Sequence, residues 1–139
     1  VFTDLHASTS DLFSLRFTAN NGTAYLSGST YDYCSQNSTN TSNTQYASNA
    51  ANRIIFGYWN MSTYSGHASH GEITFSNLAH TSYYPSIYWT WKYTDTSNLP
   101  VRSYGSGHYR ANGAMTGFQI FPGSGNIETG TFTLYGMVS

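Results

Sequence analysis

Apolar and polar residues alternate with a period of two in several segments of this chain. The longest example lies between residues 87 and 94. One set of alternating positions is Ile87, Trp89, Trp91 and Tyr93, and the other is Tyr88, Thr90, Lys92 and Thr94. Because consecutive side chains of a strand point to opposite faces, this segment predicts a strand with one buried and one solvated face. We expect the first set, with both tryptophans, to lie in the core.

Shorter segments repeat this alternation, at residues 13–18, 72–75, 118–120 and 131–134. No window of about a dozen residues carries the i, i+3, i+4 apolar spacing of a helix. Turn-forming pairs and clusters separate the segments, at residues 21–22, 65–66, 105–107, 112–113 and 122–125. Strands separated by turns, without helices between them, are typical of sandwiches and barrels. The sequence therefore predicts an all-β fold, a single antiparallel, jelly-roll-like β-sandwich of about eight to ten strands over residues 1–139.

One segment interrupts the alternation. Residues 35–52 are rich in Ser, Thr and Asn, and Tyr46 is their only aromatic residue. A loop of this length inside a compact domain is usually functional or mobile. The alternatives are a solvated excursion from the sandwich or a polar edge strand. We find no internal repeat and no domain boundary elsewhere in the chain.

The composition excludes several classes of protein. Only 8% of the residues are charged and the net charge is −1, whereas nucleic-acid binding needs clustered Lys and Arg. No segment approaches the roughly 20 apolar residues that a membrane-spanning helix needs, so we expect no membrane partner. An aromatic content of 17% favours a folded chain over a disordered one.

The single cysteine, Cys34, leaves no internal disulfide to form. The chain begins at Val1 and shows no signal-peptide pattern, so we expect either processing or partial coverage of a longer protein.

The strongest candidates for a metal site are His67, His70 and Glu72. Zinc needs three or four ligands that converge on one point, and histidines spaced by three residues converge on a helix. Gly71 disfavours a helix here, and in an extended segment the two rings point to opposite sides. The sequence therefore predicts a polar turn that leads into the strand of Glu72, with no metal and no cofactor.

Hydrolysis of a glycoside would need two carboxylates on either side of one bond. The available carboxylates show no pairing; they are Asp4, Asp11, Asp32, Glu72, Asp95 and Glu128. Three of these, Asp11, Asp32 and Asp95, fall in expected turns, where Asp commonly caps the backbone. Residues 105–107 and 123–125 are expected to be turns too, and not nucleophile elbows. We therefore expect no catalytic residues.

Carbohydrate binding is harder to exclude, because sugar sites combine aromatic faces with neutral hydrogen-bonding groups. Aromatic residues near expected turns are the candidates for exposed rings, and they are Tyr58, Trp59, Tyr64, Tyr83, Tyr84, Tyr104 and Tyr109. Tyr58, Trp59, Tyr64 and Tyr109 are the leading surface candidates. Aromatic residues of strands also form cores, and tyrosines also form protein interfaces.

The last part of the chain, GFQIFPGSGNIETGTFTLYG at residues 117–136, carries a recognisable motif. It resembles the closing motif of β-sandwich modules in bacteriophage virion proteins, which occur in tail fibres, head fibres and capsid decorations of marine and cyanobacterial phages. The matching residues are Ser124, Gly125, Asn126, Ile127, Leu134, Tyr135 and Gly136. Residues 1–5, 15–17 and 107–110 also resemble parts of this family. Glu128 departs from the small residue that is common there, and residues 137–139 extend past the motif.

The resemblance implies a non-enzymatic structural protein on the virion surface. Such a module would dock to capsid or fibre proteins as a homo-oligomer, and we expect a homotrimer. The alternative is a lectin-like receptor-recognition module at a fibre tip that binds a host glycan.

The motif also predicts local structure. Gly125 and Asn126 tolerate the positive φ angles of a tight hairpin, and Ile127 is expected to fix the turn to the core. A last strand is expected to finish in Leu-Tyr-Gly, with Phe132 and Leu134 pointing inward and Tyr135 outward.

Overall fold

The computed structural model describes residues 1–136 and contains ten strands and no helix among them. Every strand pairing is antiparallel. The larger sheet has seven strands in the order β10 (Ile127–Phe132), β1 (Phe2–Ala7), β6 (Ser69–Ser76), β7 (Ser86–Thr94), β8 (Pro100–Tyr109), β3 (Tyr31–Ser38) and β4 (Asn43–Ala51). The smaller sheet has three strands in the order β5 (Ile54–Ile55), β2 (Phe13–Thr18) and β9 (Gly117–Pro122).

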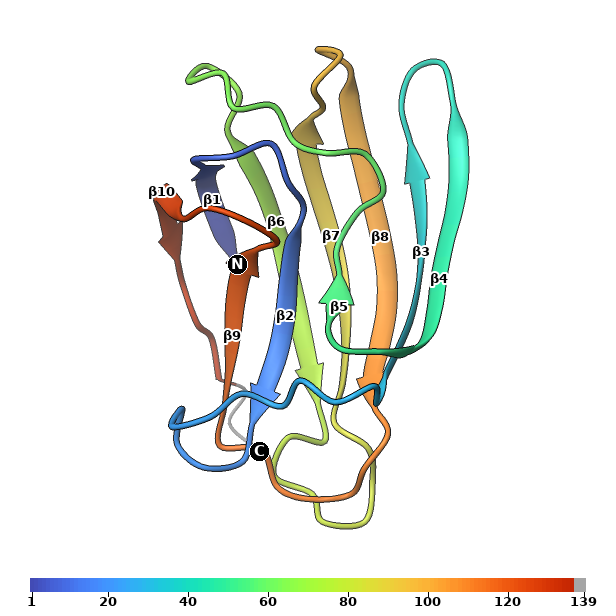
Figure 1. The fold of residues 1–139 in the computed structure, drawn as a ribbon, viewed down its shortest axis with the longest axis vertical. Coiled ribbons are helices and arrows are strands. Elements are labelled where there is room, and N and C mark those ends of the chain that lie inside the picture. Colours follow the sequence, from blue (N-terminus) through green and yellow to red (C-terminus); the bar gives the residue numbers. More distant parts are fainter. Residues whose placement is uncertain (137–139) are drawn as a thin grey trace.

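The two sheets form the two layers of a sandwich. Figure 1 shows the smaller sheet lying across one face of the larger sheet. The chain changes sheet repeatedly, from β1 to β2 to β3, from β4 through β5 to β6, and from β8 to β9 to β10. The expected all-β, antiparallel sandwich is therefore confirmed, with a jelly-roll-like exchange of strands between the layers.

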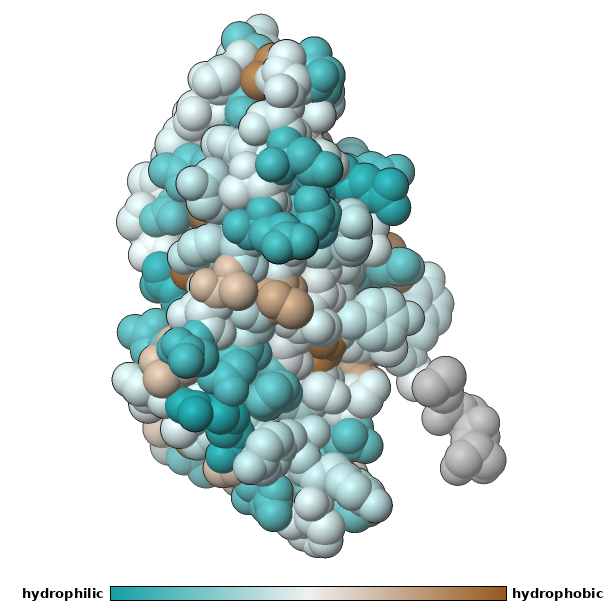
Figure 2. All heavy atoms as spheres, turned by 90° about the vertical axis from the view of Figure 1, so that its right-hand side faces the viewer, coloured by the Kyte–Doolittle hydropathy of each residue, from teal (hydrophilic) through white to brown (hydrophobic). Residues whose placement is uncertain are grey.

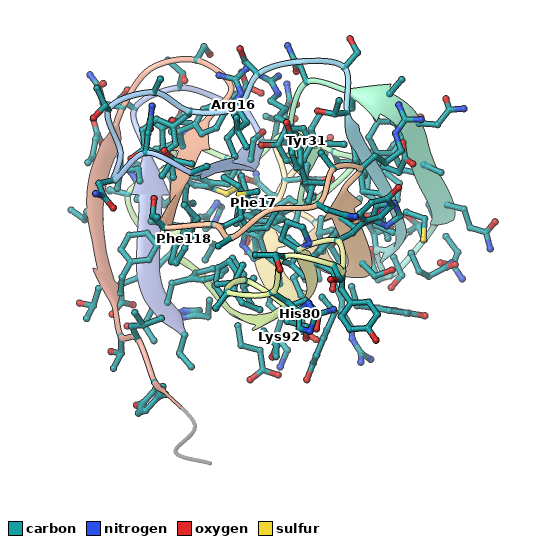
Figure 3. All side chains as sticks on the ribbon, turned by 90° about the horizontal axis from the view of Figure 1, so that it is seen from below. Arg16, Phe17, Tyr31, His80, Lys92 and Phe118 are labelled. Atoms are coloured by element: carbon teal, nitrogen blue, oxygen red, sulfur yellow. The ribbon has the colours of Figure 1, made fainter. Side chains whose placement is uncertain are left out.

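The core lies between the layers and is rich in aromatic rings. Trp89 and Trp91 of β7 are each 1% exposed, as their positions in the alternating segment predict. The Trp91 ring lies 5.3 Å from that of Phe13, on β2, and 5.6 Å from that of Phe56, which follows β5. In Figure 3, Phe17 and Phe118 lie between the layers, whereas Arg16 and Lys92 lie toward opposite outer sides. Contacts between large rings of the two sheets thus hold the layers together.

Glycines on neighbouring strands make room for large core rings: a Cβ atom at Gly71 would lie 2.7 Å from the Phe2 ring, and one at Gly105 would meet the Trp89 ring. Gly105 of β8 is paired with Trp89, and Gly71 of β6 is paired with Trp91. A Cβ atom at Gly105 would lie 2.5 Å from the Trp89 ring, because the indole covers the backbone of β8. The turn expected at residues 105–107 is therefore wrong. These glycines lie inside a strand, where a large neighbour leaves no space for a side chain.

The polar segment at residues 35–52 is mostly strand and not a loop. It completes β3, turns at residues 39–42 and forms β4, which lies at one edge of the larger sheet. The interpretation as a loop is wrong, and the edge-strand alternative describes β4. Inside β3 the polar residues pair with each other: the buried Asn37 amide donates to Ser35 Oγ at 2.9 Å. Figure 2 views the molecule from the β4 side, where hydrophilic residues dominate and apolar ones are scattered.

Candidate ligand-binding groove

The outer face of the larger sheet, turned away from the smaller sheet, carries the most distinctive surface of the molecule. Its residues alternate with the core residues of each strand. From four adjacent strands it includes Tyr88 and Thr90 of β7, Arg102, Tyr104 and Ser106 of β8, Cys34 and Gln36 of β3, and Gln45 and Ala47 of β4. We refer to this set as the outer-face cluster.

The strand register arranges the cluster in two rows across the sheet. The first row runs Thr90, Tyr104, Gln36, Gln45, and the second row runs Tyr88, Ser106, Cys34, Ala47. Apart from the tyrosine, the second row has only small side chains. The result is a groove of about 620 Å³, which we call the outer-face groove. Small residues form its floor, and larger side chains form its sides.

Two tyrosine rings project into solvent at this groove. Tyr88 is 53% exposed and Tyr104 is 45% exposed, so neither ring is needed for the core. Tyr88 and Tyr104 are diagonal neighbours on adjacent strands, a separation that long side chains can bridge. Each ring offers an apolar face and a hydroxyl group that can both donate and accept a hydrogen bond.

The polar groups of the groove are almost all neutral. Arg102 is the one charged residue among those that line it, and its guanidinium carbon lies 5.4 Å from the centre of the Tyr104 ring. The Gln36 amide donates to Asn43 Oδ1 at 2.6 Å, which fixes its orientation. Cys34 Sγ lies 3.8 Å from Ser106 Oγ at the floor. The groove can therefore offer stacking surfaces and hydrogen bonds to a ligand, with little electrostatic attraction.

A second hollow, of about 550 Å³, continues the same face toward the β6–β7 loop. It includes Tyr83 and Tyr84, which are 59% and 46% exposed. The Tyr84 ring stacks on the imidazole of His108 with 5.6 Å between ring centres. His108 is paired with Ser86, one step along the face from the pair of Tyr88 and Ser106. Exposed aromatic rings thus follow β7 and β8 along much of their length.

The four leading surface aromatics from the sequence do not form one group, although the rings of Tyr58 and Trp59 lie 5.1 Å apart. Tyr58 and Tyr64 are exposed as expected, at 44% and 67%, but they lie outside both hollows. Trp59 and Tyr109 are partly buried against the core, so their expected exposure is wrong. The Tyr109 ring packs 5.1 Å from that of Tyr31. Both rings belong to strand ends or loops that fold back onto the sandwich. A residue's position near a turn in the sequence does not show whether its loop folds back in this way.

Sequence reasoning missed Tyr88 as a binding candidate, although it placed Tyr88 on the solvated side of its strand. The sequence did contain a signal for Tyr88, because a large aromatic ring on the solvated face of an alternating strand is a candidate for ligand contact. Of the seven aromatic residues near expected turns, Tyr104 lines the groove, and Tyr83 and Tyr84 line the second hollow.

The turn of the closing motif, between β9 and β10, contributes contacts to the fold. Gly125 has a φ angle of 72°, as expected for the hairpin, whereas Asn126 does not have a positive φ angle. The turn docks on the loop between β1 and β2: Thr9 Oγ1 donates to the Ser124 carbonyl at 2.6 Å, and the Asn126 N–H donates to Ser8 Oγ at 2.9 Å. Ile127 is partly buried against the core, as predicted.

The end of the motif differs from the prediction. β10 ends at Phe132, so Leu134, Tyr135 and Gly136 lie beyond the strand. Phe132 and Leu134 were expected to point inward, but they are 48% and 76% exposed. Figure 1 shows β10 at the left-hand margin of the larger sheet, to one side of the strands of the smaller sheet. Tyr135 is exposed, as predicted. Residues 137–139 lie outside the described residues.

Four of the carboxylates have basic side chains or backbone N–H groups as their partners. Asp32 lies inside β3 and not in a turn, with Oδ1 3.3 Å from Arg110 Nε and Oδ2 3.5 Å from His108 Nε2. Asp11 and Asp95 do cap backbone N–H groups, as expected. Glu128 Oε2 lies 3.0 Å from His6 Nδ1.

The two histidines considered as metal ligands have different neighbours. His67 Nδ1 lies 3.1 Å from Ser62 Oγ, in the turn before β6. His70 lies in β6, with Nε2 4.0 Å from Asp4 Oδ1. Within residues 1–136, no three His, Cys, Asp or Glu side chains are grouped as metal ligands would be.

Comparisons with known proteins identify no relative: no family model, no curated protein and no solved structure matches the chain. The part of the chain that the structure describes also has no helix long and apolar enough to cross a membrane.

Proposed function

We propose that this chain is a non-enzymatic structural module on the surface of a bacteriophage virion, where it docks to capsid or fibre proteins as a homo-oligomer. The observation that carries this proposal is an exposed apolar surface at the end of β10, which we call the C-terminal patch. It consists of Phe132, Leu134 and Tyr135, which are 48%, 76% and 74% exposed. Grouped large apolar side chains on a surface mark interaction sites.

The position of the patch supports docking between protein chains. β10 is an edge strand of the larger sheet, so one side of its backbone has no strand partner among the described residues. The Phe132 ring lies 6.3 Å from that of Phe2, which connects the patch to the core. We assign the patch to contacts between copies of this chain, and we expect a trimer. A chain with so few charges must rely on apolar and hydrogen-bonded contact for such an interface.

The location on a phage particle is supported by the resemblance of the closing motif. Its turn residues hold the β9–β10 connection to the loop that precedes β2, through Ser124 and Asn126. This is a role in the scaffold and not in catalysis, and it agrees with a module whose function is to be a stable, exposed building block.

The oligomeric state tests the interface. We expect sedimentation velocity to show a trimer in both 0.1 M and 1 M salt, because apolar contacts are only weakly screened. The double variant L134S/Y135S should be monomeric. Tyr64→Ser removes an equally exposed ring outside the patch and should leave the assembly unchanged. A monomeric parent chain at micromolar concentration, or an assembly that dissociates in salt, would contradict the proposal.

Immunogold labelling tests the location. Antibodies to this chain should decorate the surface of intact phage particles in electron micrographs. Label confined to lysed cells, with bare particles, would exclude a virion role whatever the oligomeric state.

A second candidate function is recognition of a glycan. It is favoured by one specific observation, the groove of exposed tyrosines and neutral polar groups on the outer face. The two functions use different surfaces, since the C-terminal patch and the outer-face groove share no residue.

A further inference from the structure

We propose that the outer-face groove is a binding site for a neutral oligosaccharide, with Tyr88 and Tyr104 as its stacking surfaces. This inference rests on the second candidate function and is independent of the oligomeric role of the C-terminal patch. It also moves the site away from Tyr58, Trp59, Tyr64 and Tyr109, the aromatics that sequence alone favoured.

The shape of the groove comes from the register of four strands. The row of Ser106, Cys34 and Ala47 leaves a hollow beside Tyr88, and the neighbouring row raises Tyr104, Gln36 and Gln45 above it. A pyranose ring fits such a hollow, because the C–H groups of one of its faces can lie against an aromatic ring while its hydroxyls meet polar side chains. Ligand sites generally combine a concave apolar surface with a few placed polar groups.

The chemistry of the lining favours a neutral ligand. Gln36 and Gln45 each present an amide donor and acceptor, and Thr90 and Ser106 present hydroxyls. Sugar hydroxyls both donate and accept, so they can pair with these amides and hydroxyls, while an ionic ligand would find few opposite charges here. Arg102 is held over the Tyr104 ring at 5.4 Å, where its N–H groups can donate to a ring or hydroxyl oxygen at the end of the groove.

The side chains in and around the groove disfavour a nucleic acid or a lipid as its ligand. Lys92 is paired with Arg102, but Glu72 is paired with Thr90 on the next strand, so this end of the groove has mixed charge. A phosphate backbone needs a continuous row of basic groups. A lipid would need a lining with few hydrogen-bonding groups, whereas Gln36, Gln45 and Thr90 line this groove.

The length of the aromatic surface favours a chain of sugars over a single sugar. Tyr104, Tyr88 and Tyr84 follow one another along β7 and β8, and Tyr84 is supported from below by His108. Successive outward positions on a strand are roughly 7 Å apart. An extended oligosaccharide could therefore contact the groove and the second hollow at once.

Affinity electrophoresis in gels containing neutral glucan, mannan or galactan tests this assignment. We expect at least one of these polysaccharides to retard the parent protein, with little change between 0.1 M and 1 M salt. Tyr88→Ala and Tyr104→Ala should each weaken the apparent affinity by about tenfold, which corresponds to roughly 1.4 kcal/mol. Ala47→Trp should fill the hollow and abolish retardation, while Tyr64→Ala, which removes an exposed ring elsewhere, should have no effect.

The single cysteine provides a second, direct measurement. Cys34 is exposed at the floor of the groove, so a bound polysaccharide should slow its alkylation by a maleimide. The Y88A/Y104A variant should lose this protection, although its Cys34 still reacts. Protection that persists in this variant would overturn the assignment of the site.

Three other results would overturn the inference: no retardation by any of the three polysaccharides, an equal loss of affinity in Tyr64→Ala, or binding only to anionic polysaccharides at low salt. None of these results bears on the C-terminal patch. In turn, L134S/Y135S should keep the parent's affinity per binding site, measured by the protection of Cys34 with a short neutral oligosaccharide so that avidity does not enter. Failure of one proposal is therefore distinguishable from failure of the other.

Discussion

The hydroxyl oxygen of Tyr31, on β3 of the larger sheet, accepts a hydrogen bond from the backbone N–H of Phe17, on β2 of the smaller sheet, at 2.9 Å. The same hydroxyl donates to the carbonyl of Leu26 at 2.9 Å. β5 pairs with β2 only at Ser14 and Leu15, so the Phe17 N–H has no strand partner on that side. A fully buried side chain thus completes the hydrogen bonding of a strand in the opposite layer.

Removal of this hydroxyl should destabilise the fold. Tyr31→Phe keeps the ring but leaves the Phe17 N–H and the Leu26 carbonyl without their partner, and an unsatisfied buried group costs about 1–3 kcal/mol. Urea unfolding should show a loss of this size in the free energy of unfolding. Tyr64→Phe, at an exposed position, is the matched control and should change it by no more than about 0.5 kcal/mol. Equal stability of the two variants would contradict the role assigned to Tyr31.

Stability should fall at alkaline pH. Burial raises the pKa of Tyr31 to about 12, partly offset by the hydrogen bond from the Phe17 N–H, and burial also raises the pKa of Tyr33 and Tyr93. An unfolded tyrosine ionises near pH 10, so above that pH the unfolded chain binds fewer protons than the folded chain. The stabilisation is present in full below about pH 10 and is lost as the pH rises through the folded pKa.

This pH dependence can be measured by urea unfolding at about pH 8 and about pH 11.5. Because one pKa unit corresponds to about 1.4 kcal/mol and pH 11.5 lies about 1.5 units above the unfolded pKa, Tyr31 alone accounts for at most roughly 2 kcal/mol between these two pH values. Tyr31→Phe should reduce the difference between the two pH values, and Tyr64→Phe should not. A free energy of unfolding that stays constant over this range would show that these phenols are not held neutral by the fold.

Truncation of Trp91 should remove much of the core. The side chain is 1% exposed and its ring contacts Phe2, Phe13, Phe56 and Tyr93. Trp91→Ala should therefore cost about 3–5 kcal/mol, as truncation of large buried aromatics does. Tyr88→Ala, on the opposite face of the same strand, should cost far less. An unchanged melting temperature in Trp91→Ala would show that this side of β7 is not the buried one.

Gly105 should not tolerate a methyl group. A Cβ atom there would meet the Trp89 ring at 2.5 Å and the Cys34 carbonyl oxygen of β3, so Gly105→Ala must displace the indole or the backbone of β8 and β3. Overpacking of this kind costs about 1–3 kcal/mol. Gly28→Ala is the control, because its nearest neighbour would be 3.8 Å away. Thermal unfolding of the two variants gives the comparison, and equal melting temperatures would contradict the tight packing of Trp89 on β8.

The sequence indicated the local pattern of this fold well. Alternation placed Trp89 and Trp91 on the buried side of β7 and Tyr88 on the solvated side, because the two-residue period of a strand is a property of its own backbone. It could not predict the exposure of Phe132 and Leu134, since their burial depends on whether the second sheet reaches over β10. Nor could it show that residues 43–51 pair as an edge strand, because β-pairing is satisfied by backbone groups whatever the polarity of the side chains.

The residues alone were therefore enough to derive the class of fold, an all-β chain with two tryptophans on the buried side of one strand, and a surface with few charges. Which side chains meet follows only from how the strands pair. Tyr88, Tyr104 and Gln36 come from segments far apart in the chain, and the register between β7, β8 and β3 brings them to one groove. A shift of one residue in that register would turn every side chain of the shifted strand to the opposite face of the sheet. The groove is therefore a product of how the strands pair, and no single strand is enough to form it.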